Sequence, residues 1–178
     1  MPITPDDKDW TWVLHRACPD CGLDVSAVAA TEVADGVRAN AVEWGRLLDD
    51  PRATSRPSED QWSALEYGCH VRDVFRIFQT RVAALLDDDD PTFENWDQDA
   101  TAVEDRYAEQ DPAVVADEIA EAATVLAAQI DAVGGEQWER PGSRSDGARF
   151  TLATLVRYML HDPVHHVWDV QTGYVRLG

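Results

Sequence analysis

The sequence predicts an all-α fold: a four-helix bundle preceded by an irregular N-terminal arm, with one long loop between the second and third helices. Four stretches repeat apolar residues at every third or fourth position, which is the period of a helix that buries one face. Proline, glycine and acidic residues separate these stretches. No stretch alternates apolar and polar residues in the way that a half-buried strand does.

We expect two parts in the chain, an arm of residues 1–24 and the bundle of residues 25–178. A chain of 178 residues can bury a core without disulfide bonds or a metal to support it. Tryptophans in the arm are expected to anchor it to the bundle, and the pair Cys18-x2-Cys21, followed by glycine, predicts a turn.

Each helix has its own boundary signals. The first is expected over about residues 26–48, where a proline and a polar stretch end it. The second is expected to follow Ser58, because serine caps helices and acidic residues come directly after it. The third has Asp111 as its cap with proline next, and a Gly-Gly pair closes it. The fourth starts near Phe150 or Thr151 and continues to about Gln171.

The connection between the second and third helices, residues 87–110, is long and acidic. It nevertheless carries the aromatic residues Phe93, Trp96 and Tyr107. Loops of this length are uncommon unless they serve a function, so we expect this one to cover a site.

The charge of the chain excludes some partners. A net charge of −19 disfavours binding to nucleic acids, which require a basic surface, and to anionic membranes. No apolar run approaches the length of a membrane span, and the polar, acidic first residues do not resemble a signal peptide. We therefore expect a cytoplasmic protein.

Histidines give the strongest functional signal. His161 and His165 are four residues apart, so on one helix their imidazoles project from the same face and can converge on a metal ion. Two ligands rarely suffice, and His70, within the apolar stripe of the second helix, is the candidate for the third. A single buried histidine is more often only a packed, hydrogen-bonded residue, but the pair favours a metal. We predict a site of His70, His161 and His165.

Residues near these histidines have expected roles as well. A carboxylate commonly orients a ligating imidazole through its second nitrogen, and Asp73, Asp162 and Asp169 are the candidates. Solvated surface charge is their alternative role in so acidic a chain. Tyr158 and Trp168 each lie three residues from a histidine of the pair and are expected to line the pocket. We predict no catalytic residue beyond the metal ligands.

Two features of the last helix are irregular. Pro163 removes a helical hydrogen bond, so the helix either kinks there or restarts with Asp162 as its cap. His166 lies about 100° around the helix from His165 and is expected at the surface or beside a ligand.

The Cys18-x2-Cys21 pair has three open interpretations: a structural turn with free thiols, part of a structural metal site, or a redox pair. His15 extends the pattern to H-x2-C-x2-C, and a tetrahedral site would need a fourth ligand, for which Cys69 is one candidate. A redox pair normally opens a helix after a strand, and no strand is expected here.

Several of these motifs together resemble a known family. Trp62-Ser precedes His70 by eight residues, and Phe150-Thr-Leu leads into the string His-Asp-Pro-Val-His-His and then Asp169. Over about residues 25–172 the chain resembles the DinB-like superfamily, in particular its actinobacterial branch with mycothiol-dependent enzymes.

The resemblance implies a four-helix bundle that holds a divalent metal, zinc or nickel, through His70, His161 and His165. Such enzymes bind a small thiol as thiolate and add it to an electrophile, as in mycothiol-dependent maleylpyruvate isomerase and the thiol S-transferases. We therefore expect a metal-dependent thiol S-transferase whose partners are a mycothiol-like thiol and an electrophile; a homodimer is left open. A metal-dependent hydrolase, or a non-catalytic metal-binding bundle that responds to stress, is the alternative.

Overall fold

The computed structural model describes residues 9–178. The α-helices of this part are α1 (Val33–Leu48), α2 (Ala64–Asp87), α3 (Gln98–Glu104), α4 (Pro112–Asp131) and α5 (Leu152–Leu177). The strands are β1 (Thr92–Phe93), β2 (Pro141–Arg144) and β3 (Arg149–Thr151). Short 3-10 helices are η1 (Thr11–Leu14), η2 (Val25–Ala27), η3 (Ala30–Glu32), η4 (Tyr107–Glu109) and η5 (Gly135–Glu139). No helix within residues 9–178 is both long enough and apolar enough to cross a membrane.

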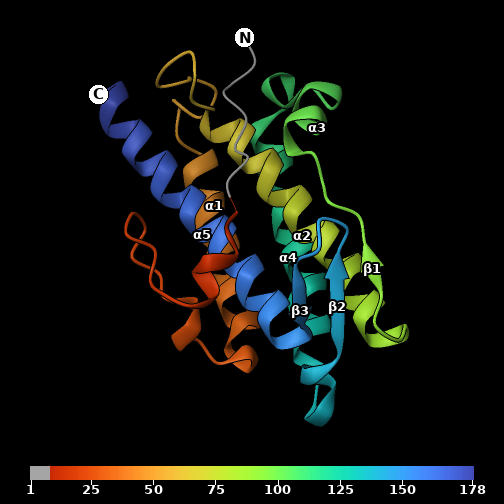
Figure 1. Cartoon of the computed structure of the whole chain (residues 1–178). Coiled ribbons are helices and arrows are strands. Elements are labelled where there is room, and N and C mark those ends of the chain that lie inside the picture. Colours follow the sequence, from red (N-terminus) through yellow and green to blue (C-terminus); the bar gives the residue numbers. More distant parts are fainter. Residues whose placement is uncertain (1–8) are drawn as a thin grey trace.

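The four long helices, α1, α2, α4 and α5, form the predicted four-helix bundle (Figure 1). α1 packs against α4 and α5, and α2 packs against the same two helices, so the consecutive helices α1 and α2 lie diagonally across the bundle. The predicted apolar stripes meet in one core, whose fully buried members include Trp44, Phe75, Leu85, Leu126 and Leu155.

The N-terminal boundary of α2 differs from the prediction. The helix begins after Ser63, whose hydroxyl accepts a hydrogen bond from the backbone N–H of Glu66 while the Glu66 carboxylate accepts one from the Ser63 N–H. Arg56 donates to the same carboxylate. Ser58 precedes this box and pairs with Gln61 in an isolated bridge, so the prediction of Ser58 as the cap was wrong. The helix starts where the capping box and a partly buried ion pair coincide.

The later helices begin where the sequence predicts. Asp111 accepts hydrogen bonds from the first backbone N–H groups of α4, and Thr151 caps α5. α5 runs without a break through Pro163 and past the predicted end, so the restart reading is wrong. The Pro163 carbonyl accepts hydrogen bonds from Nδ2 of Asn40 at 3.0 Å and from Nε1 of Trp44 at 3.3 Å, which attaches this turn of α5 to α1.

The connections between the helices contain a small sheet that the sequence did not predict. Its order is β1-β2-β3, with β1 parallel to β2 and β2 antiparallel to β3. These strands have two to four residues each, too few to produce a recognisable alternation. Gly142 in β2 has no room for a side chain, because a Cβ there would lie 2.8 Å from Cδ1 of Leu85. The sheet therefore packs directly against the end of α2 (Figure 1).

Residues 9–24 of the N-terminal arm lie along α5, where Figure 1 shows them in red beside the blue helix. η1 packs against α5, and the Val13 and Cys18 side chains are buried. Trp10 and Trp12 contact each other and reach the histidine segment of α5, so the arm is anchored in the way that the sequence predicts.

Candidate functional site

The histidine segment of α5 forms one wall of a cavity of about 1270 Å³. The other walls come from α2, the arm around η1, the connection between β1 and α3, and the turn between β2 and β3. Residues 95–99 of the predicted long loop thus line the cavity.

A first group of possible ligands joins α2 to α5. His70, Asp162 and His166 each offer one ligand atom, and these atoms lie within 4.8 Å of one another. Oδ1 of Asp162 is 3.1 Å from Nε2 of His70 and 3.8 Å from Nε2 of His166. Asp162 and His166 are one helical turn apart on α5, so they face α2 together.

Neighbouring side chains fix the positions of both imidazoles. Oδ2 of Asp169 lies 2.8 Å from Nδ1 of His166, which leaves Nε2 directed at Asp162. The buried His70 ring stacks on Trp96, with 5.2 Å between the ring centroids and 6° between the planes. Trp62 packs on His70 as well. The aromatic rings and the carboxylate hold the two histidines in orientations that allow them to bind one ion.

The carboxylate of this group remains ionised. Burial alone would raise the pKa of Asp162, but the neighbouring His70 and His166, together with the hydrogen bond to His70, lower it below its usual range. An anionic carboxylate between two imidazoles is the form that binds a divalent cation.

A second group joins the arm to α5. Cys18, Cys21, His161 and His165 also bring one ligand atom each within 4.8 Å of one another. Sγ of Cys18 is 3.6 Å from Nδ1 of His165, and Sγ of Cys21 is 3.8 Å from Nε2 of His161. Both cysteines carry free thiols.

Burial sets the protonation of this second group. It lowers the pKa of His161 to about 4, with a further contribution from the nearby His165, whose own pKa burial also lowers. Burial raises the pKa of Cys21 to about 11. Without a cation, the two neutral imidazoles therefore face a protonated Cys21 thiol at neutral pH.

The predicted histidine trio is divided between the two groups. Within residues 9–178, His161 and His165 converge as expected, but on the two cysteines, while His70 meets Asp162 and His166. The reason is the helical period. His161 and His165 face the arm, whereas the residues that follow each of them are turned about 100° towards α2. Binding of a metal to either group stays a prediction.

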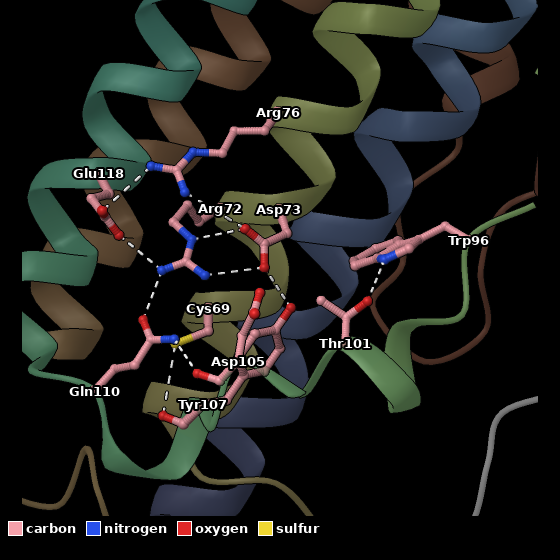
Figure 2. Close-up of polar contacts among 10 residues, drawn as sticks. All are labelled: Cys69, Arg72, Asp73, Arg76, Trp96, Thr101, Asp105, Tyr107, Gln110 and Glu118. Atoms are coloured by element: carbon pink, nitrogen blue, oxygen red, sulfur yellow. Dashed lines mark hydrogen bonds and ion pairs between the residues drawn. The ribbon is translucent and has the colours of Figure 1, made fainter. Parts of the chain in front are cut away.

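Of the predicted carboxylates, Asp162 belongs to the first group, and Asp169 forms a hydrogen bond with His166 of that group. Asp73 lies elsewhere. Asp73 pairs with Arg72 and accepts a hydrogen bond from the Tyr107 hydroxyl (Figure 2). Arg72 also binds Gln110 and Glu118. This network attaches the end of the long loop to α2 and α4, which is a structural role.

Two further candidates from the sequence lie apart from both groups. His15 is exposed and lines the cavity. Cys69 is buried, and its Sγ lies 3.9 Å from the carbonyl oxygen of Tyr107. Tyr158 and Trp168 both line the cavity. The Trp168 ring packs on His165, with 5.6 Å between the centroids.

Two arginines of the cavity wall, Arg81 and Arg144, were not predicted from the sequence. Arg81 is buried, packs over Phe78 and Phe93, and within the described residues forms no ion pair; burial lowers its pKa to about 10. Arg144 pairs with Asp146 and donates to the Tyr158 hydroxyl. The available signal was the position of Arg81 in the apolar stripe of α2, where an arginine is unusual.

Comparisons with known proteins agree with this architecture. The sequence model of the DinB superfamily matches residues 34–170. The solved structure of YfiT from Bacillus subtilis, described as "a probable metal-dependent hydrolase with an unusual four-helix bundle topology", is similar with a TM-score of 0.72 and 16% identity. The similarity covers 92% of this chain and 91% of YfiT, and at this identity it shows the fold. No curated protein matches the sequence significantly.

Proposed function

Because the chain belongs to the DinB superfamily, we propose that it is a metal-dependent enzyme that holds a divalent cation through His70, Asp162 and His166. One observation carries the proposal: two imidazoles and an ionised carboxylate converge in the wall of the large cavity.

The donor set fits such a cation. Two imidazoles and one carboxylate form a three-ligand set that leaves coordination positions open, as catalytic zinc and related sites require. A divalent ion bound there lowers the pKa of a coordinated thiol or water and so supplies a nucleophile at neutral pH.

The protein's own residues prepare this site. Asp169 holds the His166 ring through Nδ1, so its Nε2 remains directed at the ion position. Trp96 and Trp62 cover the His70 ring and exclude water from its faces. Asp162 supplies the negative charge that partly neutralises a divalent ion.

The size of the cavity favours a thiol S-transferase. Pockets that bind one small molecule usually measure about 300–1000 Å³, and this cavity measures about 1270 Å³. It has room for two substrates, a mycothiol-like thiol and an electrophile. Arg81, which forms no ion pair within residues 9–178, places a guanidinium group on its wall, and this favours an anionic group on one substrate.

A hydrolase is the second candidate, because the structurally similar YfiT is described as a probable metal-dependent hydrolase. The same three ligands would serve a hydrolase equally well, with water as the nucleophile and one substrate in the cavity.

Rates with and without metal test the proposal. Protein loaded with zinc or with nickel should consume a small thiol in the presence of electrophiles, and Asp162→Asn should lose this activity together with the ion held by His70, Asp162 and His166. The matched control is Asp117→Asn, the same chemical change on the exposed face of α4. Hydrolysis of esters or amides without thiol consumption would select the hydrolase, and full activity of Asp162→Asn would contradict both.

A further inference from the structure

We propose that Cys18, Cys21, His161 and His165 bind a structural zinc ion that joins the N-terminal arm to α5. This inference does not depend on the proposed function, because it concerns a different set of ligands on a different face of the helix.

The ligand spacings fit a tetrahedral zinc site. With Zn–S of about 2.3 Å and Zn–N of about 2.0–2.1 Å, sulfur and nitrogen ligands of a tetrahedron lie about 3.6 Å apart. The Cys18–His165 and Cys21–His161 pairs measure 3.6 Å and 3.8 Å between sulfur and nitrogen. The four ligand atoms already occupy positions that one ion can bridge with little movement.

The polar atoms of this cluster are poorly satisfied by one another. Cys18, His161 and His165 are 1%, 4% and 9% exposed. Thiols are weak hydrogen-bond partners, so the contacts between sulfur and nitrogen compensate little of the cost of burying two imidazoles. A cation would satisfy all four ligand atoms at once.

The surroundings indicate a closed site rather than a catalytic one. The Trp10 ring packs on His161 and His165, with centroid distances of 5.5 Å and 5.3 Å, and Trp12 packs on His161. With four protein ligands and aromatic cover, no coordination position remains for a substrate, which is the pattern of structural zinc.

Local backbone structure presents the two sulfurs together. The Gly22 N–H donates to the Cys18 carbonyl at 2.9 Å, and the Cys18 N–H donates to the Leu23 carbonyl at 2.9 Å. Gly22 has a φ of +76°, which a side chain would disfavour. α5 supplies the two nitrogens from His161 and His165, which are four residues apart. Thiolates together with imidazoles form a donor set that selects zinc over hard cations such as magnesium.

A disulfide between the cysteines is the competing arrangement. It would remove both sulfur ligands and leave the two imidazoles facing an apolar bridge without partners. The two thiols are free, and each lies beside a different histidine.

Elemental analysis of variants tests the proposal. Cys18→Ser/Cys21→Ser should lose one zinc per chain relative to the wild type. Cys69→Ser, a change at the buried cysteine outside the cluster, should keep it. His70→Gln, which removes a ligand of the other site, should lose only that site's ion, and the zinc that remains should be lost when Cys18→Ser/Cys21→Ser is added. Unchanged zinc in the double variant, or a Cys18–Cys21 disulfide in protein that holds its full zinc content, would overturn the proposal.

The wild type gives a second test that does not depend on variants that fold. Cobalt substituted for zinc should produce the thiolate-to-metal charge-transfer absorption of a tetrahedral site with sulfur ligands, and chelation should lower the Tm. Absence of that absorption in cobalt-loaded wild type would overturn the inference and leave the His70 site unaffected. If His70→Gln removes the only zinc, this site does not exist.

Discussion

Asp169 and His166 form a hydrogen bond of 2.8 Å between Oδ2 and Nδ1, three residues apart on α5. The imidazole donates this bond through Nδ1–H, so its other nitrogen carries the lone pair that faces Asp162. The same carboxylate oxygen lies 3.8 Å from Nε2 of His165. One carboxylate therefore contacts a histidine of each candidate metal site.

We expect Asp169→Asn to weaken metal binding at the His70 site by about 10- to 100-fold, because the amide is a poorer acceptor and orients the ring less well. Competition with a chromogenic chelator measures the affinity for the metal ion. The ion of the His70 site is identified as the one that His70→Gln removes. The control is Asp117→Asn on the exposed face of α4. Equal affinity in Asp169→Asn and the control would show that the hydrogen bond does not position the ligand.

Arg81→Met should weaken the binding of a carboxylate-bearing substrate analogue by about 10-fold or more, because a buried guanidinium contributes a charge-assisted hydrogen bond. Methionine keeps most of the apolar contact with Phe78 and Phe93. The control is Arg46→Met, because the Arg46 side chain is 74% exposed. Isothermal titration with the analogue and with its neutral amide distinguishes loss of charge recognition from general damage, which would weaken both equally.

The Arg56–Glu66 ion pair at the start of α2 should make stability depend on pH. Burial alone would raise the pKa of Glu66, but the hydrogen bonds from Arg56 and Ser63 lower it below 4.5. The unfolded chain then binds more protons than the folded one near pH 4, so this contribution is present above about pH 4.5 and is lost as the pH falls.

Glu66→Gln should reduce the free energy of unfolding at pH 7 by about 2 kcal/mol, because Arg56 loses its charged partner. The difference from the wild type should shrink as the pH falls below 4.5. Urea unfolding at a series of pH values measures it. A difference that stays constant from pH 7 to pH 3 would show that the ion pair does not carry the effect.

Local signals predicted the fold well. The apolar period predicted the four long helices, and the cap at Asp111 acts as expected because it depends only on neighbouring residues. Ser58 is not the cap, because Ser63 forms a capping box with Glu66 instead. Arg56 binds the same Glu66 carboxylate, and local sequence patterns do not reveal this contact.

The site was harder to predict because it depends on which helix face meets which neighbour. Histidine spacing correctly brought His161 and His165 together. It could not show that the arm supplies the cysteines that face them, or that Asp162 and His166 face His70 instead. Those pairings join residues 92 to 147 positions apart in the sequence, and only the packing of α5 between α2 and the arm determines them.

Anomalous diffraction from crystals of zinc-loaded protein, recorded on both sides of the zinc edge, tests the central claim most directly. We predict an anomalous peak at a zinc ion that His70, Asp162 and His166 coordinate, with at least one coordination position open to the cavity. A peak coordinated by His70 together with His161 and His165, or protein of full zinc content without a peak at His70, would contradict the account.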